Sequence, residues 1–154
     1  VIGVEIAGSL KNVIALTSGI MFGLGFGDNS QAALITRGLT EISRLGIRLG
    51  AHQQTFSGLA GIGDLIATCT SEHSRNRRAG EALAAGKSLK EICSGTNMVI
   101  EGINATVSAY KIAQKFNIEM PITNSLYQIL YEKKNPRAAL QELMRRSGKR
   151  EYII

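Results

Sequence analysis

Apolar residues recur along this chain at intervals of three or four positions, which is the period of one face of an α-helix. The clearest run contains five apolar positions: Ile35, Leu39, Ile42, Leu45 and Leu49. The cluster Asp28-Asn29-Ser30 precedes this run and contains the side chains that commonly cap helix N-termini. No long stretch alternates apolar and polar residues as a half-buried strand would. The pattern therefore predicts an all-α fold.

Start and stop signals divide the rest of the chain into further helices. Ser88-Leu89-Lys90-Glu91 has the capping-box pattern, and Gly95 lies where the helix that follows should end. Pro121 and Pro136 suit the first turns of two later helices, and Asn135 is a candidate N-cap. We expect seven or eight helices in one multi-helix, bundle-like domain over residues 1–154. Loops are expected near residues 27–29, 53–60, 71–74, 95–100, 117–121 and 133–136.

Length and composition limit the class of protein. A chain of 154 residues can bury roughly two thirds of its unfolded surface, so it can fold without disulfides or metals. Two cysteines and two histidines lack ligand spacing, so we expect no metal site. Cys69 and Cys93 should be reduced thiols that pack as small hydrophobic side chains. Residues 12–27 carry no charge but fall short of the roughly 20 apolar residues of a membrane span, so they predict a buried helix.

The sequence begins inside a helical pattern, without an initiator methionine or a secretion signal. We therefore expect it to be part of a longer cytoplasmic protein. Its 18 basic and 12 acidic residues give a net charge of +6, which would suit nucleic acid, an acidic membrane surface or a phosphorylated small molecule. Aromatic residues do not alternate with the basic ones as they do in single-strand binders, so charge alone does not choose a partner.

The stretch AGSLKNVIAL places a lysine and an asparagine beside a long apolar run. Glu5, Gly8 and Lys11 follow one another at intervals of three positions and Asn12 lies four positions after Gly8, so we expect them to share one helix face. Glycine within a helix costs about 0.5–1 kcal/mol relative to alanine, which is reasonable if another group must approach the backbone closely. Two simpler interpretations stay open: Gly8 packs against a neighbouring helix, or Lys11 is an ordinary solvated lysine.

A second cluster lies in GLAGIGDLIATCTS, where Asp64 and Thr68 are four positions apart. If a helix begins near Gly63, both side chains lie on one face near its N-terminus, and the preceding glycines let a ligand approach. Alternatively, Asp64 is simply the N-cap of that helix.

A third cluster, Ser74-Arg75-Asn76-Arg77-Arg78, follows a turn and should open another helix. Arginines in a first turn oppose the helix dipole at a cost of up to about 1 kcal/mol, unless an anion binds there. Free N–H groups and an arginine fork would suit a phosphate. The alternative for Arg77 and Arg78 is a solvated basic face.

Five segments in order resemble the C-terminal domain of the NAD(P)-dependent glycerol-3-phosphate dehydrogenase family, the bacterial type especially. They are VEIAGSLKNVIAL, GFGDNSQAALITRGL, TFSGLAGIGDLIATCTSEHSRNRRAG, IEGINA and EMPI. The resemblance implies an all-helical substrate domain like the C-terminal domain of 6-phosphogluconate-dehydrogenase-like enzymes, and an N-terminal Rossmann domain that this chain lacks. The family interconverts sn-glycerol 3-phosphate and dihydroxyacetone phosphate for glycerophospholipid synthesis. This chain should be inactive without the Rossmann domain.

The resemblance also implies roles for single residues. Lys11 matches the lysine that transfers a proton to or from the C2 oxygen, and apolar surroundings with nearby cations would favour the neutral amine that removes the proton. Asp64 matches its conserved partner, which would orient Lys11 or bind a substrate hydroxyl. Asn12 and Thr68 match positions that hydrogen-bond in the same catalytic site.

Further matched residues concern the phosphate and the cofactor. The resemblance implies that Ser74, Arg75 and Asn76 bind the phosphate group of the substrate. It also implies that Lys11 and Asp64 bind the other end of the substrate molecule. Arg75, Val99 and Glu101 contact the cofactor, which is NAD or NADP and is held mainly by the Rossmann domain. A homodimer is possible, and we expect neither nucleic-acid binding nor membrane insertion.

Two other functions stay open. One is another two-domain dehydrogenase with a helical second domain, acting on 6-phosphogluconate or a 3-hydroxyacid, although SRNRR after GDLIATC argues against it. The other is a non-catalytic helical module whose basic patches bind nucleic acid or phospholipid headgroups.

Overall fold

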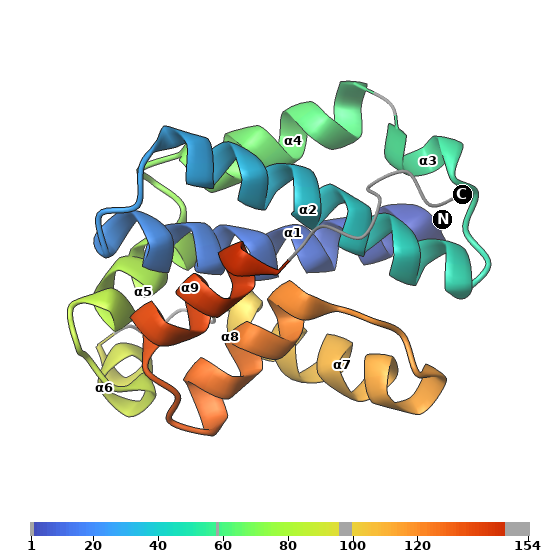
Figure 1. Cartoon of the computed structure of the whole chain (residues 1–154). Helices are drawn as coiled ribbons and strands as arrows, with labels where there is room; N and C mark the ends of the chain where they lie inside the picture. Colours follow the sequence, from blue (N-terminus) through green and yellow to red (C-terminus); the bar gives the residue numbers. More distant parts are fainter. Residues whose placement is uncertain (1, 58, 96–99, 147–154) are drawn as a thin grey trace.

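A computed structural model gives the fold and describes residues 2–57, 59–95 and 100–146. All regular elements of these ranges are helices, which confirms the all-α prediction. There are nine of them, namely α1 (Ile2–Gly23), α2 (Asp28–Arg48), α3 (Gln54–Ser57), α4 (Leu59–Thr70), α5 (Arg75–Ala84), α6 (Leu89–Ser94), α7 (Glu101–Phe116), α8 (Pro121–Tyr131) and α9 (Pro136–Arg145). Helix α1 runs through the middle, with α2 and α4 on one side and α5, α8 and α9 on the other (Figure 1).

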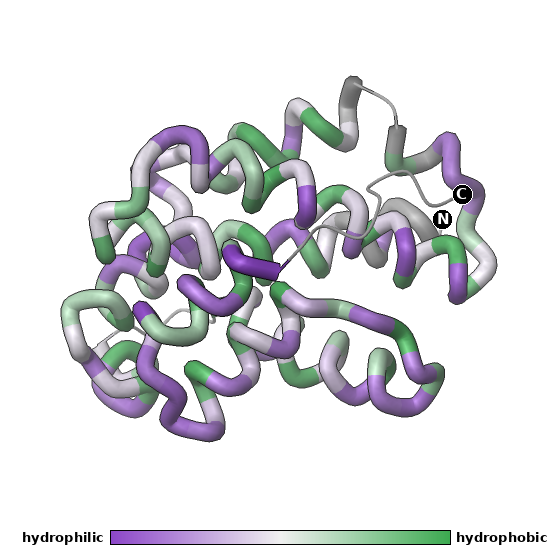
Figure 2. Tube along the Cα trace, in the orientation of Figure 1, coloured by the Kyte–Doolittle hydropathy of each residue, from purple (hydrophilic) through white to green (hydrophobic). Residues whose placement is uncertain are grey.

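Helix α1 is the core element. Every residue from Asn12 to Met21 is buried, because α2, α4, α5, α7 and α8 all pack around it. A helix that is hydrophobic on all sides is stable only when neighbours cover it. The charge-free run was predicted as a buried helix, and the structure confirms burial from Asn12 to Met21, whereas Phe22 and Gly23 at the end of α1 are exposed. Elsewhere hydrophobic and hydrophilic residues alternate along the helices within a few positions (Figure 2). In the part of the chain that is described, no helix has the length and apolar character needed to cross a membrane.

Helices α1 and α5 approach backbone to backbone. A Cβ added to Gly19 would lie 2.1 Å from the carbonyl oxygen of Arg77, and one added to Gly80 would lie 2.2 Å from that of Leu16. Real Cβ atoms do not come so close to other heavy atoms, so both positions require glycine unless the helices separate. The contact brings Asn76, one turn before Gly80, beside Asn12, one turn before Leu16.

A buried carboxylate ties α2 to α8. Glu41 is 3% exposed and accepts hydrogen bonds from the backbone N–H groups of Ile122 (2.8 Å) and Thr123 (2.9 Å) and from the Thr123 hydroxyl (2.8 Å). These N–H groups belong to the first turn of α8 and have no partner inside their own helix. Burial raises the pKa of Glu41, and the hydrogen bonds from Ile122 and Thr123 oppose that shift. Glu41 therefore caps α8 from another helix.

Several predicted boundaries are confirmed. Ser88 and Glu91 form the capping box of α6, which ends at the C-cap Gly95. The side chain of Asn135 caps α9, and both prolines occupy first turns. The loops near residues 71–74, 117–121 and 133–136 lie where expected, while the loop expected at 95–100 falls largely outside the described residues. The predicted stripe of α2 faces the core, with Ile42 and Leu45 buried and the other three members half-buried.

Three predictions about elements are wrong. The stretch 53–60 was expected to be a loop but contains α3 and the start of α4, so the number of helices exceeds the predicted seven or eight. The N-cap of α2 is Gly27 without a side-chain cap, so Asp28 lies inside the first turn, where its charge suits the helix dipole. Cys69 is buried as expected, and burial raises its pKa to about 12, but Cys93 is exposed rather than packed.

The close approach of α1 and α5 predicts the result of one substitution. Gly80→Ala should lower the free energy of unfolding by about 1–3 kcal/mol, because the added methyl forces the two backbones apart. Gly63→Ala is the matched control, since no described atom lies within 4 Å of its added Cβ and alanine favours the helix by about 0.5–1 kcal/mol. Urea unfolding measures both changes. Equal stability of the Gly80 variant and the unsubstituted chain would contradict the backbone contact.

The Glu41 cap predicts a dependence of stability on pH. Its pKa is raised in the folded chain above the ordinary value of 4.5, so its contribution to stability falls as the pH rises through the folded-state pKa. Glu41→Gln cannot titrate and leaves a first-turn N–H of α8 unpaired, at a cost of about 1–3 kcal/mol. The advantage of the unsubstituted chain over this variant should shrink between about pH 5 and about pH 8. Urea unfolding at both pH values checks this, with the exposed Glu132→Gln as control.

Candidate active site

Two adjacent residues of α1 begin the site. Lys11 and Asn12 are consecutive, so their side chains leave the helix about 100° apart. Lys11 points toward α4 and Asn12 toward α5 and α7, as their hydrogen bonds show. One helix therefore holds two polar groups with different partners.

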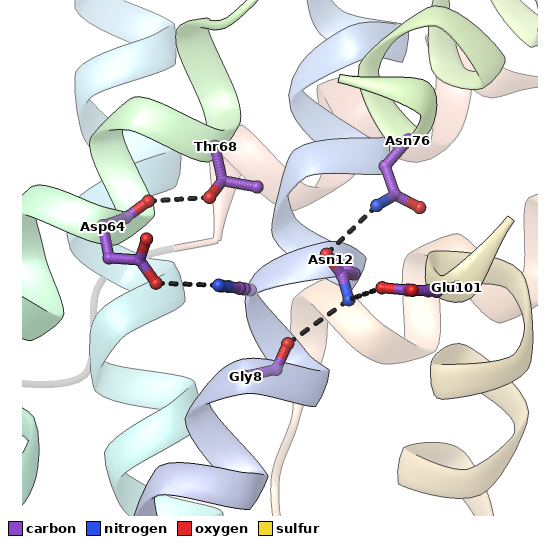
Figure 3. Close-up of polar contacts among 7 residues, drawn as sticks. Gly8, Asn12, Asp64, Thr68, Asn76 and Glu101 are labelled. Carbon is purple, nitrogen blue, oxygen red and sulfur yellow. Dashed lines mark hydrogen bonds and ion pairs between the residues drawn. The ribbon is translucent and has the colours of Figure 1, made fainter. Parts of the chain in front are cut away.

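On the α4 side, Lys11 pairs with Asp64. The Lys11 Nζ lies 2.8 Å from Asp64 Oδ2, and the two side chains are 30% and 58% exposed. The Thr68 hydroxyl donates to the Asp64 carbonyl at 2.7 Å, one turn along the same helix (Figure 3). Sequence reasoning expected dry surroundings and cationic neighbours for Lys11. The structure shows a half-buried lysine whose partner is a carboxylate.

The helix that carries Asp64 begins earlier than predicted. Because α4 starts at Leu59, Asp64 lies in its middle, and the N-cap interpretation of Asp64 is wrong. Its carboxylate therefore points from the side of α4 toward Lys11 and does not cap the N-terminus of α4. The solvated interpretation of Lys11 is also wrong, since the lysine is half-buried and paired.

Gly8 lies one turn before Asn12 on α1. A Cβ added at Gly8 would meet no described atom within 4 Å, so the structure does not support helix packing as the reason for this glycine. Its carbonyl oxygen accepts a hydrogen bond from Asn12 Nδ2 at 3.3 Å. The position leaves space beside the polar groups of α1.

On the other side, Asn12 joins a chain of amides. Asn12 Nδ2 donates to Glu101 Oε2 at 3.1 Å, and Asn76 Nδ2 donates to Asn12 Oδ1 at 3.1 Å (Figure 3). Asn76 Oδ1 accepts from the Gly102 N–H at 2.8 Å. The predicted site residues Asn12, Asn76 and Glu101 are thus brought into contact, although they are far apart in sequence. Sequence reasoning missed Gly102, whose only signal was its place directly after Glu101 in the segment IEGINA.

The start of α5 has the predicted cap. The Ser74 hydroxyl accepts a hydrogen bond from the Arg77 N–H at 3.2 Å, and Arg75 is exposed in the first turn. Arg77 does not belong to a solvated basic face, because it donates to the Thr70 carbonyl and lies over the Phe22 ring, 4.5 Å from its centroid. The Arg77 guanidinium therefore links α5 to the end of α4 and to α1.

A cavity of about 400 Å³ adjoins this helix start. Its lining includes three cationic side chains, Arg75, Arg78 and Lys87, with one carboxylate, Glu91. Apolar side chains of α5, α6 and the residue before α7 complete the described wall. Such a charged recess suits an anion such as a phosphate or a pyrophosphate. Lys87 was not predicted as a site residue, since an isolated lysine in a turn gives no sequence signal.

One predicted residue cannot be compared. Val99, expected to contact the cofactor, lies outside the described residues, whereas Glu101 is seen at the first position of α7. Within the described ranges, no three His, Cys, Asp or Glu side chains gather in a way that could hold a metal ion.

Comparison with known proteins identifies the family. A family model described as the C-terminus of NAD-dependent glycerol-3-phosphate dehydrogenase matches residues 1–141. The chain is 60% identical over 151 residues to a glycerol-3-phosphate dehydrogenase [NAD(P)+] of Thermoanaerobacter sp., covering 98% of this chain and 46% of the relative. A protein of the same name from Geobacillus thermodenitrificans is 55% identical over 150 residues, covering 97% and 44%. The chain thus spans about half the length of these relatives.

Solved structures agree with this. A crystal structure of glycerol-3-phosphate dehydrogenase from Coxiella burnetii superposes with a TM-score of 0.91 at 49% identity, covering 95% of this chain and 45% of that one. The corresponding Saccharomyces cerevisiae enzyme has a TM-score of 0.83 at 29% identity, covering 94% and 42%. The chain that carries the Lys11–Asp64 pair and the arginine-rich start of α5 therefore belongs to the family of NAD-dependent glycerol-3-phosphate dehydrogenase C-terminal domains.

Proposed function

We propose that the protein containing this chain catalyses the reversible reduction of dihydroxyacetone phosphate to sn-glycerol 3-phosphate, with NAD or NADP as cofactor. The observation that carries the proposal is the Lys11–Asp64 pair on one side of α1, near the arginine-rich start of α5. Relatives that this chain matches are named glycerol-3-phosphate dehydrogenase [NAD(P)+]. Supply of glycerol 3-phosphate for glycerophospholipid synthesis in the cytoplasm is part of the proposal, as is a second domain that precedes this one.

Lys11 transfers the proton at the C2 oxygen. In the reduction, its ammonium donates a proton to the carbonyl oxygen, and in the oxidation the amine takes the proton from the C2 hydroxyl. Asp64 holds the Lys11 nitrogen at 2.8 Å and restricts its directions, while the Thr68 hydroxyl bonds within the same turn of α4. Asn12, the next residue of α1, hydrogen-bonds in the same site. The nicotinamide cofactor would supply the hydride at C2.

The start of α5 binds the phosphate. Ser74, Arg75 and Asn76 lie at the N-terminal end of the helix, where backbone N–H groups and the helix dipole favour an anion. Arg75 adds a guanidinium that can form two parallel hydrogen bonds to phosphate oxygens. The contact to Asn12 uses one of two Asn76 Nδ2 hydrogens, so the second can serve the phosphate.

The residues present also fit a dinucleotide cofactor. The cavity beside Arg75 carries the cations Arg78 and Lys87, and a pyrophosphate is an anion that such a group can hold. Glu101 presents an exposed carboxylate at the start of α7, suited to a ribose hydroxyl. Arg75, Glu101 and Val99 are therefore the proposed cofactor contacts in this domain.

The competing functions find less support. The family assignment and the resolved Lys11–Asp64 pair favour this enzyme over other two-domain dehydrogenases. A nucleic-acid or headgroup module would present Arg75 to Arg78 together, but the Arg77 guanidinium lies over the Phe22 ring and donates to the Thr70 carbonyl. A homodimer stays a prediction, which sedimentation of the full-length protein would test.

Lys11→Met in the full-length protein should lower kcat for dihydroxyacetone phosphate reduction by about 10²–10⁴, because it removes the amine proposed to transfer the proton. NADH oxidation in the presence of dihydroxyacetone phosphate measures this. Lys111→Met, an exposed lysine of α7, is the matched control and should keep normal turnover. A Lys11 variant with near-normal kcat would show that this lysine does not transfer the proton.

Arg75→Ala should raise the KM for dihydroxyacetone phosphate by about 10- to 100-fold, the effect of losing a charge-assisted hydrogen bond to the phosphate. The same variant should lose much less activity on dihydroxyacetone, which has no phosphate. Steady-state kinetics on both substrates separate the two effects, with the exposed Arg145→Ala as control. An equal loss on both substrates would exclude Arg75 as a phosphate ligand.

A further inference from the structure

Asn12, Asn76 and the start of α7 form a closed ring of hydrogen bonds. Three bonds follow one another: the Gly102 N–H donates to Asn76, Asn76 donates to Asn12, and Asn12 donates to Glu101. Glu101 and Gly102 are covalent neighbours, so the ring closes through the peptide bond between them. The ring joins α1, α5 and α7.

The donor-to-acceptor direction of the hydrogen bonds in the ring is determined by the Gly102 N–H. A backbone N–H can only donate, so the Gly102 N–H requires that Asn76 present its carbonyl oxygen. The amide nitrogen of Asn76 must then point to Asn12, which in turn presents its own oxygen to Asn76. What remains of the Asn12 amide is its nitrogen, and both groups that it meets, the Gly8 carbonyl and the Glu101 carboxylate, are acceptors. Each donor in the ring thus meets an acceptor.

Burial makes this direction rigid. Asn12 is 8% exposed and Asn76 is 7% exposed, so water cannot readily replace a lost partner. A flipped amide would place two donors or two acceptors face to face, and leaving a buried polar group without a partner is strongly unfavourable because its lost hydration is not replaced. The space is also closed on the α7 side, since a Cβ at Gly102 would lie 2.6 Å from Asn76 Oδ1 and 2.7 Å from the Asn12 carbonyl oxygen.

We propose that Asn76 is a positioning residue: it fixes the Asn12 amide so that Asn12 donates to Glu101, and thereby holds the start of α7 against the α1 turn that carries Lys11. This inference rests on the proposed function in that Glu101 and Lys11 serve one active site. It adds to the phosphate contact proposed for Asn76, because it acts through the two groups of Asn76 that face inward. The cofactor side and the proton-transfer side of the site are then coupled through one buried amide.

The substitution that tests this is Asn76→Asp in the full-length protein. The carboxylate keeps the shape and the acceptor for Gly102 but removes the donor to Asn12. Asn12 must then flip to offer its nitrogen, which turns its oxygen toward the Glu101 carboxylate. NADH binding, measured by fluorescence without any substrate, should weaken about 10-fold or more, and kcat/KM on phosphate-free dihydroxyacetone should fall by a similar factor.

A second substitution should rescue the first. In the double variant Asn76→Asp with Glu101→Gln, the glutamine amide can donate to the flipped Asn12 oxygen, so NADH binding should recover at least about half of the loss on the free-energy scale. Glu101→Gln alone completes the double-mutant cycle. Lys111→Met is the control for substitution of an exposed residue of α7. Asn12→Asp, with and without Glu101→Gln, repeats the test at the hydrogen bond between Asn12 and Glu101. This pair replaces the first pair if circular dichroism shows that Asn76→Asp does not fold.

The outcomes separate the two proposals. Weaker NADH binding that Glu101→Gln restores supports the positioning role, because a residue of purely structural importance would lower the melting temperature without this rescue. Unchanged NADH binding and unchanged dihydroxyacetone turnover, with loss confined to dihydroxyacetone phosphate, would leave Asn76 a phosphate ligand only and overturn the inference. Absence of rescue in both pairs would overturn it as well. An unsubstituted protein that binds NADH but does not reduce dihydroxyacetone phosphate would instead refute the proposed function, and NADH binding by the variants would still decide the positioning role.

Discussion

The contact between α1 and α5 is the constraint on which the rest of the site depends. At Gly19 and Gly80 the two backbones meet with no room for a Cβ, and this fixes both the distance and the alignment of the helices. One turn away, the same alignment places Asn76 against Asn12. A short amide side chain cannot follow its partner across a wider gap, so the buried ring exists only because the helices come this close. Packing of small residues in the core thus determines polar geometry in the site.

The helical twist of α1 directs two neighbouring polar side chains to different sides. Consecutive residues diverge by about 100°, so Lys11 meets the carboxylate of Asp64 while Asn12 meets the amide and carboxylate of α5 and α7. The Lys11–Asp64 pair is partly exposed, whereas Asn12 and Asn76 are buried. In the proposed reaction, buried supports behind an accessible lysine would hold the reacting atoms in place, since small displacements of those atoms cost much of the rate.

Comparison of the predictions with the structure shows where local signals are sufficient. Capping residues report on their own helix, so the ends at Ser88, Gly95 and Asn135 were predicted correctly. The start of α4 was not, because its glycine-rich first turns have low helix propensity, whereas α4 as a whole packs on α1, α2 and α3. For this reason Asp64 was predicted at the N-terminus of a helix, whereas it lies in the middle of α4. The cap of α8 was also hidden, since its acceptor, Glu41, comes from a helix about 80 residues earlier.

The sequence by itself determined the helical class, several helix ends, the buried character of residues 12–21 and the residue types gathered in three clusters. It did so because hydrophobic period, caps and charge-free runs act over a few neighbouring residues. Only the tertiary structure gave the geometry of the contacts: the Lys11 nitrogen lies 2.8 Å from Asp64, Arg77 lies over the Phe22 ring, and Asn76 faces Asn12 and Gly102. These contacts join residues 26 to 64 positions apart, and no local sequence pattern contains the distance between two helices or the direction of a side-chain amide.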